Sequence, residues 1–100
     1  MAKPSWPRIA DFLIRRLSIV VVSYNTREMT AGAIRSVYGE TREASFEIIV
    51  VDNGSSDGSA EAIEAAFPQV KVIRRPDNPG FAAGNNIAAR EANGKYLLLL

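Results

Sequence analysis

LSIVVVS, residues 17–23, is the stretch of sequence that decides the fold. It is a continuous run dominated by β-branched residues, which is typical of a strand buried on both faces of a parallel sheet. FEIIVV, residues 46–51, is a second run of this kind, and weaker runs occupy residues 70–74 and 95–100. The sequence therefore predicts four strands, and each interval between them is long enough to hold a helix.

The three intervals between these strands carry helix signals. The first two contain apolar residues at helical spacing: Met29, Ala33 and Val37, then Ala60, Ile63 and Phe67. Asn25 is placed to cap the first helix and Gly39 to end it, while Pro68 stops the second. We expect a third helix over residues 81–92. The order βαβαβαβ predicts an α/β fold, a mostly parallel open sheet with right-handed crossovers and helices on its faces.

The composition is that of an ordinary globular domain and excludes several chemistries. Of the 100 residues, 47% are hydrophobic and 23% are charged. The chain has no cysteine and no histidine, which excludes disulfides, thiolate or histidine metal sites and a Ser-His-Asp triad. The formal net charge of +1 gives no reason to expect nucleic acid as a partner.

Residues 1–16 differ from the rest of the chain and are expected to form an N-terminal arm. Ile9, Phe12 and Leu13 fall at helical spacing, and two arginines follow them. We expect either a short packing helix or a basic amphipathic segment that rests on a membrane surface. No apolar run reaches the length of a transmembrane helix, and the interrupted apolar stretch does not fit a secretory signal.

Ligands of open α/β sheets bind outside the carboxyl ends of the strands, here residues 23–25, 52–57 and 78–86. In the first segment, Tyr24 either stacks on a flat base or packs on a neighbour. In the second, the acceptors and donors that begin at Asp52 suit the hydroxyls and ring nitrogens of a nucleoside. The same segment is also compatible with an ordinary turn whose residues cap the next helix.

The third segment enters a helix N-terminus, which favours anions such as phosphates. Its alternative interpretation is a tight loop with a helix packed close to the sheet. It matches neither the dinucleotide fingerprint nor the P-loop. Arg74 and Arg75 end a strand toward the same edge, where they either meet a phosphate or are solvated.

The order of four motifs adds a resemblance to a known family. The segments LSIVVVSYN, EIIVVDNGSSDGS, NPGFAAGNN and GKYLLLL together resemble the start of a family 2 glycosyltransferase, and most closely its rhamnosyltransferase-like subgroup. The resemblance covers residues 17–100. It implies a partial GT-A (Rossmann-like) fold, truncated after the fourth strand, that forms the N-terminal nucleotide-binding part of the enzyme. The implied reaction transfers a sugar from a nucleotide-diphospho-sugar donor to an acceptor hydroxyl.

Site residues carry over from the family by position. Tyr24 is expected against the base, and Asp52 and Asn53 at the base and ribose. Asn53 stands where many relatives have a second acid, and Gly84 where several have Arg or Lys. The residues expected to bind the nucleotide-sugar are Ser23, Tyr24, Asn25, Asp52, Asn53, Gly54, Ser55, Asn78, Gly80, Phe81, Gly84 and Asn85.

The resemblance also implies a divalent metal, Mg²⁺ or Mn²⁺, that neutralises the donor diphosphate. We expect its ligands and the catalytic base beyond residue 100, so no residue of this chain is expected to be catalytic or to bind metal. The implied acceptor is a glycan, such as a cell-surface polysaccharide, or a lipid-linked saccharide. The expected location is the cytoplasm, at the inner face of the membrane.

Two alternatives to the enzyme fragment are kept. One is a non-catalytic nucleotide-binding module or an inactive truncated product, which would bind nucleotide without turnover. The other is an α/β interaction domain without a ligand. The polar residues at three successive strand ends argue against this alternative.

Overall fold

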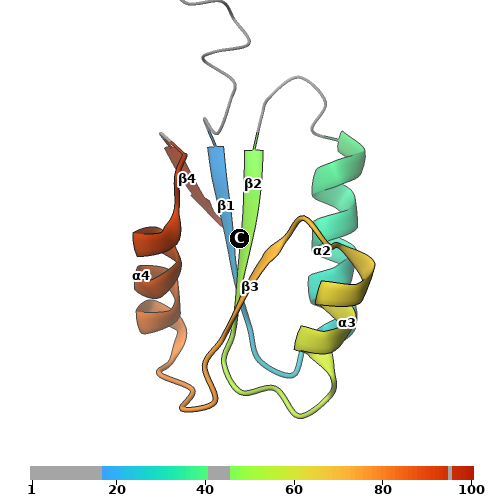
Figure 1. Ribbon diagram of the computed structural model, residues 1–100, viewed down its shortest axis with the longest axis vertical. Coiled ribbons are helices and arrows are strands. Elements are labelled where there is room, and N and C mark those ends of the chain that lie inside the picture. Colours follow the sequence, from blue (N-terminus) through green and yellow to red (C-terminus); the bar gives the residue numbers. More distant parts are fainter. Residues whose placement is uncertain (1–16, 41–45, 95) are drawn as a thin grey trace, which may run out of the picture.

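A single sheet of four parallel strands, in the order β3-β2-β1-β4, organises the computed structural model (Figure 1). The structure describes residues 17–40, 46–94 and 96–100. The strands are β1 (Leu17–Ser23), β2 (Phe46–Asp52), β3 (Lys71–Arg74) and β4 (Tyr96–Leu99). The helices are α2 (Arg27–Glu40), α3 (Ser59–Ala66) and α4 (Phe81–Glu91). The predicted α/β class, the parallel sheet and the βαβαβαβ order are confirmed, and the predicted arm of residues 1–16 lies outside the described residues.

Alternate side chains of the two central strands build two separate cores. Ile19 and Val21 of β1 point to the face that α2 and α3 cover, where they pack with Ile34 and Ile63. On the opposite face, β1 and β2 contribute apolar side chains that pack on Ala88 of α4. Figure 1 shows α4 on one side of the sheet and the other two helices on the other side. Burial of both faces explains why β1 and β2 are continuous apolar runs.

The buried face of α2 follows the predicted stripe only in part, because Val37 packs against the core but Met29 does not. Met29 is 76% exposed, whereas Ile34 is 1% exposed and belongs to the core. Ile34 directly follows Ala33 of the predicted stripe, and one residue corresponds to a rotation of about 100° around the helix. The prediction that Gly39 ends this helix is also wrong, because the helix continues through Glu40. By contrast, the apolar stripe predicted for α3 is buried, and α3 ends just before Phe67.

Strand β4 lies at an edge of the sheet. Among the described strands its neighbour is β1, in a register that places Leu17 beside Tyr96 and Val20 beside Leu99. Its four side chains are between 44% and 53% exposed. An apolar edge strand of this kind is a surface on which other chains can associate.

A hydrogen-bonded cluster at the amino ends of the strands connects α4 to the sheet. Glu47 Oε2 accepts from Ser18 Oγ at 2.6 Å and from the backbone N–H of Asn93 at 2.5 Å. The N–H of Gly94 donates to Ser18 Oγ at 2.8 Å. Burial alone would raise the pKa of the Glu47 carboxyl, but hydrogen bonds from Ser18, Asn93 and Gly94 outweigh it and hold this pKa below its ordinary value.

Gly94 is the tightest point of this cluster, and Gly94→Ala should destabilise the protein. A Cβ there would lie 2.5 Å from Ser18 Oγ and 2.7 Å from the Ser18 backbone nitrogen. We expect a loss of about 1–3 kcal/mol in the free energy of unfolding, measured by urea denaturation. Gly32→Ala in α2 is the matched control, because nothing lies within 4 Å of the added Cβ. That variant should gain roughly 0.5–1 kcal/mol. Equal effects of the two substitutions would contradict the packing at Gly94.

Glu47 should also make the stability depend on pH. Because the folded-state pKa is lowered, its contribution is present above the unfolded-state pKa and is lost as the pH falls through the folded-state pKa. Glu47→Gln should therefore be less stable than the wild type at neutral pH, and the difference should shrink on acidification to about pH 3. Urea denaturation at both pH values checks this. A difference that is the same at both would count against the hydrogen-bonded carboxylate.

Candidate functional site

The carboxyl ends of three neighbouring strands meet at one edge of the sheet. The register places Ser23 of β1 beside Asp52 of β2, and Asp52 beside Arg74 of β3. Backbone hydrogen bonds of 2.8 Å extend this alignment into the loops, from the N–H of Asn53 to Ser23 O and from the N–H of Arg75 to Asp52 O. The first two predicted site segments therefore lie together, and a bond from Asn53 to Gly80 joins the third to them.

Asp52 lies at the centre of this edge. Its side chain is 4% exposed. Oδ2 accepts from the backbone N–H of Ser55 at 3.1 Å, whereas the buried Oδ1 has no hydrogen-bond partner in the protein. A buried carboxylate oxygen of this kind is costly to leave unpaired, so it is suited to accept from an N–H or O–H group of a ligand.

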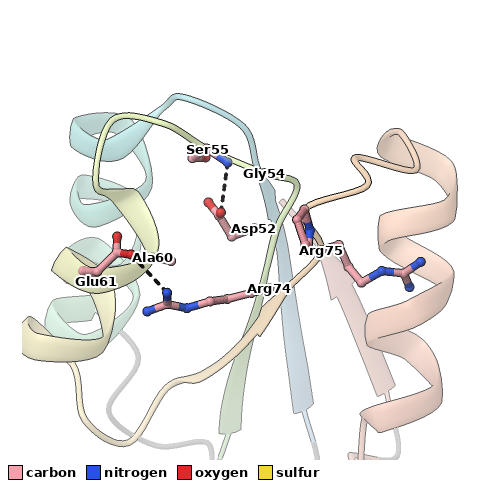
Figure 2. Close-up of a pocket in the computed structure, with 8 residues that line it drawn as sticks. Asp52, Gly54, Ser55, Ala60, Glu61, Arg74 and Arg75 are labelled. Carbon is pink, nitrogen blue, oxygen red and sulfur yellow. Dashed lines mark hydrogen bonds and ion pairs between the residues drawn. The ribbon is translucent and has the colours of Figure 1, made fainter.

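Asp52 lines a cavity of about 270 Å³ between β2, β3 and α3 (Figure 2). The other lining residues are Gly54, Ser55, Ala60, Glu61, Arg74, Arg75 and Pro76. The cavity is slightly below the usual size range of small-molecule pockets. Its charged lining includes Asp52 and the ion pair of Arg74 with Glu61.

The two arginines have different surroundings. Arg74 donates to Glu61 at 3.0 Å and to Glu64, and Figure 2 shows its side chain running across the cavity toward α3. Arg75 pairs with Asp77, with N–O distances of 2.9 and 2.7 Å, and its side chain points away from the cavity. Glu61 and Arg74 are therefore lining residues that the sequence analysis did not select. The sequence places Arg74 at this edge, and the structure adds that it pairs with Glu61 and Glu64 beside Asp52.

Asn53 connects the second loop to the third. Its side chain is 2% exposed, and Nδ2 donates to the backbone oxygen of Gly80 at 3.1 Å. Its Oδ1 is buried without a partner, as is Oδ1 of Asn85 on α4. The amide nitrogen of Asn53 is therefore engaged by the protein, and the two oxygens remain as acceptors near the start of α4.

The first segment divides into one buried and two exposed residues. Ser23 is 1% exposed, and its hydroxyl lies 3.1 Å from the hydroxyls of Thr26 and Thr30. Tyr24 is 51% exposed at the rim. Asn25 has a positive φ of 51° and accepts from the backbone N–H of Ser56 at 2.8 Å. Its side chain thus bonds to the second loop, so the prediction that Asn25 caps the first helix is not what the structure shows.

Asp57 serves the starts of two helices. Oδ2 accepts from the N–H of Arg27, the first residue of α2, at 3.1 Å, and Oδ1 accepts from the N–H of Ser59, the first residue of α3, at 3.0 Å. The Ser59 hydroxyl and these N–H groups hold the pKa of Asp57 below its ordinary value. Capping of the following helix is one of the two interpretations that the sequence offers for this segment. The contact with Arg27 could not be predicted, because it comes from a distant part of the chain.

The third segment combines an open rim with close packing. Asn78 has a positive φ of 43°, Gly80 has a φ of 96°, and Phe81 is 63% exposed. Gly84 is buried, and a Cβ there would lie 3.0 Å from Val22 Cγ1. The small residue at position 84 therefore lets α4 approach β1, as in the alternative interpretation of a helix packed close to the sheet.

The described residues do not form a metal site. Within residues 17–40, 46–94 and 96–100, no three Asp or Glu side chains gather where they could hold a cation. Glu61 lies at the same cavity as Asp52 but is ion-paired with Arg74. The Mg²⁺ or Mn²⁺ implied by the resemblance therefore does not fit this part of the chain. None of the helices described here has the length and hydropathy needed to cross a membrane.

Comparisons with known proteins agree on one family. The model described as Glycosyl transferase family 2 matches residues 18–100. An uncharacterized glycosyltransferase of Haemophilus influenzae is 37% identical over 84 residues, which cover 84% of this chain and 28% of that protein. The uncharacterized glycosyltransferase YfnE of Bacillus subtilis is 35% identical, over 83% of this chain and 22% of YfnE. The teichoic acid poly(glycerol phosphate) polymerase of Staphylococcus epidermidis is 32% identical, over 87% of this chain and 12% of the polymerase.

Solved structures share the fold. S. aureus TarS (residues 1–349) superposes with a TM-score of 0.75 and 25% identity, covering 85% of this chain and 26% of that one. The mannosyltransferase PcManGT from Pyrobaculum calidifontis, in complex with GDP-Man and Mn²⁺, gives a TM-score of 0.68 and 24% identity over 78% of this chain and 24% of its own. The chain thus spans about a quarter of the length of these structures, and its sheet and helices form part of a GT-A fold.

The backbone of the cavity loop can be tested at Gly54. Its φ is 81°, and a Cβ would lie 3.1 Å from Pro76 O. Gly54→Ala should cost about 1–3 kcal/mol in the free energy of unfolding, since strain and a backbone contact add. Gly58→Ala is the matched control, because φ there is 77° and the nearest atom to the added Cβ is an Arg27 side-chain nitrogen at 3.7 Å. In urea denaturation, Gly58→Ala should lose only the free energy that corresponds to the backbone strain of a positive φ. A larger loss for Gly58→Ala would contradict the contact between this loop and Pro76.

Proposed function

Because the chain belongs to glycosyl transferase family 2, we propose that it supplies the nucleotide-binding half of a glycosyltransferase. The enzyme transfers a sugar from a nucleotide-diphospho-sugar donor to an acceptor hydroxyl. In this proposal residues 17–100 are the nucleotide-binding part and residues 1–16 an arm. The observation that carries the proposal is the buried, unpaired Oδ1 of Asp52 beside a cavity at the carboxyl edge of the sheet.

The base of the nucleotide is proposed to enter the cavity beside Asp52. Uracil, thymine and guanine each carry a ring N–H group, from which the unpaired carboxylate oxygen can accept a hydrogen bond. Tyr24 directly follows Ser23, which the register places beside Asp52, and its exposed ring offers a stacking surface. Gly54 and Ser55 border the same cavity, and the acceptor oxygens of Asn53 and Asn85 suit ribose hydroxyls.

The phosphates are proposed to lie toward the third loop and the start of α4. Backbone N–H groups of a helix N-terminus favour anions, and this helix begins at Phe81 behind the loop of Asn78 and Gly80. Gly84 contributes through the close packing of α4 on β1 rather than through a ligand contact. These groups complete the proposed binding surface for the nucleotide-sugar.

The finer features of the enzyme are also proposals. The motifs DNGSSDGS and NPGFAAGNN support the rhamnosyltransferase-like subgroup. The S. epidermidis relative, a teichoic acid polymerase, supports a cell-surface glycan or lipid-linked saccharide as acceptor. A divalent metal, Mg²⁺ or Mn²⁺, is proposed for the complete enzyme on the resemblance and on the shared fold of PcManGT, whose structure contains Mn²⁺. The basic arm supports a cytoplasmic location at the inner face of the membrane.

A second candidate function is a nucleotide-binding module without turnover. It is favoured by the unpaired Oδ1 of Asp52 at the cavity, which can accept a hydrogen bond from a base without a metal. The two candidates differ in their metal dependence. Nucleotide affinity that rises with Mn²⁺ or Mg²⁺ favours the enzyme, and metal-independent affinity favours the module.

Titration calorimetry with UDP, GDP and dTDP, with and without Mn²⁺, tests the proposal. We expect saturable binding of at least one nucleotide and a loss of about tenfold or more in affinity for Asp52→Ala, since a hydrogen bond to a charged group is worth about 1.5–3 kcal/mol. Asp52→Asn should also bind weakly. Glu91→Ala is the control, because Glu91 pairs with Lys71 at the opposite end of the strands and should bind like the wild type. Absence of saturable binding by the wild type would rule the proposal out.

A further inference from the structure

Asn25 has a strained backbone that two hydrogen bonds hold against the second loop. Its φ of 51° is uncommon for a residue other than glycine, although asparagine tolerates this region better than most. The Asn25 N–H donates to Ser55 Oγ at 2.8 Å, and Oδ1 accepts from the N–H of Ser56 at 2.8 Å. Strained residues of this kind persist where their surroundings over-determine them, often at functional sites.

The bond from the Asn25 N–H leads through Ser55 to the carboxylate of the proposed nucleotide site, and the bond to Ser56 holds the next residue of the same loop. Ser55, which accepts from Asn25, donates its own N–H to Asp52 Oδ2 at 3.1 Å. The chain Asn25–Ser55–Asp52 therefore connects the end of β1 to the buried acid at the end of β2. A further hydrogen bond, from the N–H of Arg27 to Asp57 Oδ2, connects the same two parts of the chain.

We propose that Asn25 is a positioning residue, which orients the Asp52 carboxylate through Ser55 and Ser56 instead of touching the nucleotide. This role rests on the proposed nucleotide site and deepens it. The polar atoms of Asn25 that face the second loop are already engaged, the backbone N–H by Ser55 and Oδ1 by Ser56. A binding loop held in its bound conformation gains affinity because less ordering is left to the binding step.

The role predicts how substitutions at position 25 change nucleotide affinity. Asn25→Ala loses the acceptor for Ser56 and tolerates positive φ poorly, so its affinity for UDP or GDP should fall about tenfold. Asn25→Gly accepts the backbone conformation but lacks the acceptor, and it should also bind weakly. Asn25→Asp keeps both an acceptor and tolerance of positive φ, and it should bind within about threefold of the wild type.

A control comes from the opposite end of the strands. Glu91 pairs with Lys71 there and has no contact with the loop of Asn25 or Asp52 among those described. Glu91→Ala should therefore bind nucleotide like the wild type. Calorimetry with UDP and GDP on the 100-residue chain gives these affinities, and circular dichroism confirms that each variant is folded.

Amide hydrogen exchange without nucleotide supplies a second readout. The N–H groups of Ser55 and Ser56 should exchange about tenfold faster in Asn25→Ala and at nearly the wild-type rate in Asn25→Asp. If the wild type binds UDP or GDP but Asn25→Ala binds equally well, the role of Asn25 is wrong and the nucleotide site stands. Failure of Asn25→Asp to restore affinity likewise overturns it. A wild type that binds neither nucleotide overturns the proposed function and this role with it.

Discussion

The parallel register of β1 and β2 is the constraint on which the rest of the molecule depends. It runs from Leu17 beside Phe46 to Ser23 beside Asp52, so the two strands leave the core at the same edge. A slip of one residue would turn every side chain of a strand to the opposite face. Because both faces of these strands are buried, by α2 and α3 on one side and by α4 on the other, both cores stabilise the same register.

The edge that this register creates is held together mostly by its own polar groups. Asn25, Asp57 and Asn53 each join loops that are far apart in sequence, through bonds to Ser56, Arg27 and Gly80. Most of the polar residues at the strand ends therefore stabilise the loops. The atoms that remain for a ligand are fewer, chiefly Oδ1 of Asp52 at the cavity and Oδ1 of Asn53 and Asn85 near the start of α4. This division between supporting and ligand-binding atoms gives the proposed nucleotide site its preorganisation.

Much of this arrangement could be predicted from the sequence, because it follows from local patterns. The predicted bounds of β1 agree with the structure, and those of β2 differ by one residue. The buried face of α2 could not be predicted, because the stripes of Met29 and of Ile34 are both apolar and only the packing partners choose between them. The partners of Asn25 and Asp57 could not be predicted either. Asn25 bonds to the second loop instead of capping α2, and Asp57 bonds to the first residue of α2 as well as to that of α3.

The sequence by itself determined the α/β class, the order of the elements, the edge of the sheet where polar residues gather and the resemblance to family 2 glycosyltransferases. These features depend on periodicity, turn residues and motifs, which are local properties of a chain. Only the tertiary structure decided which polar atoms hold loops and which stay unpaired, that Gly84 packs against Val22, and that Glu61 and Arg74 line the cavity with Asp52. The physical reason is that these hydrogen bonds and close contacts form between residues distant in sequence. Their geometry exists only once β1, β2 and β3 are in register.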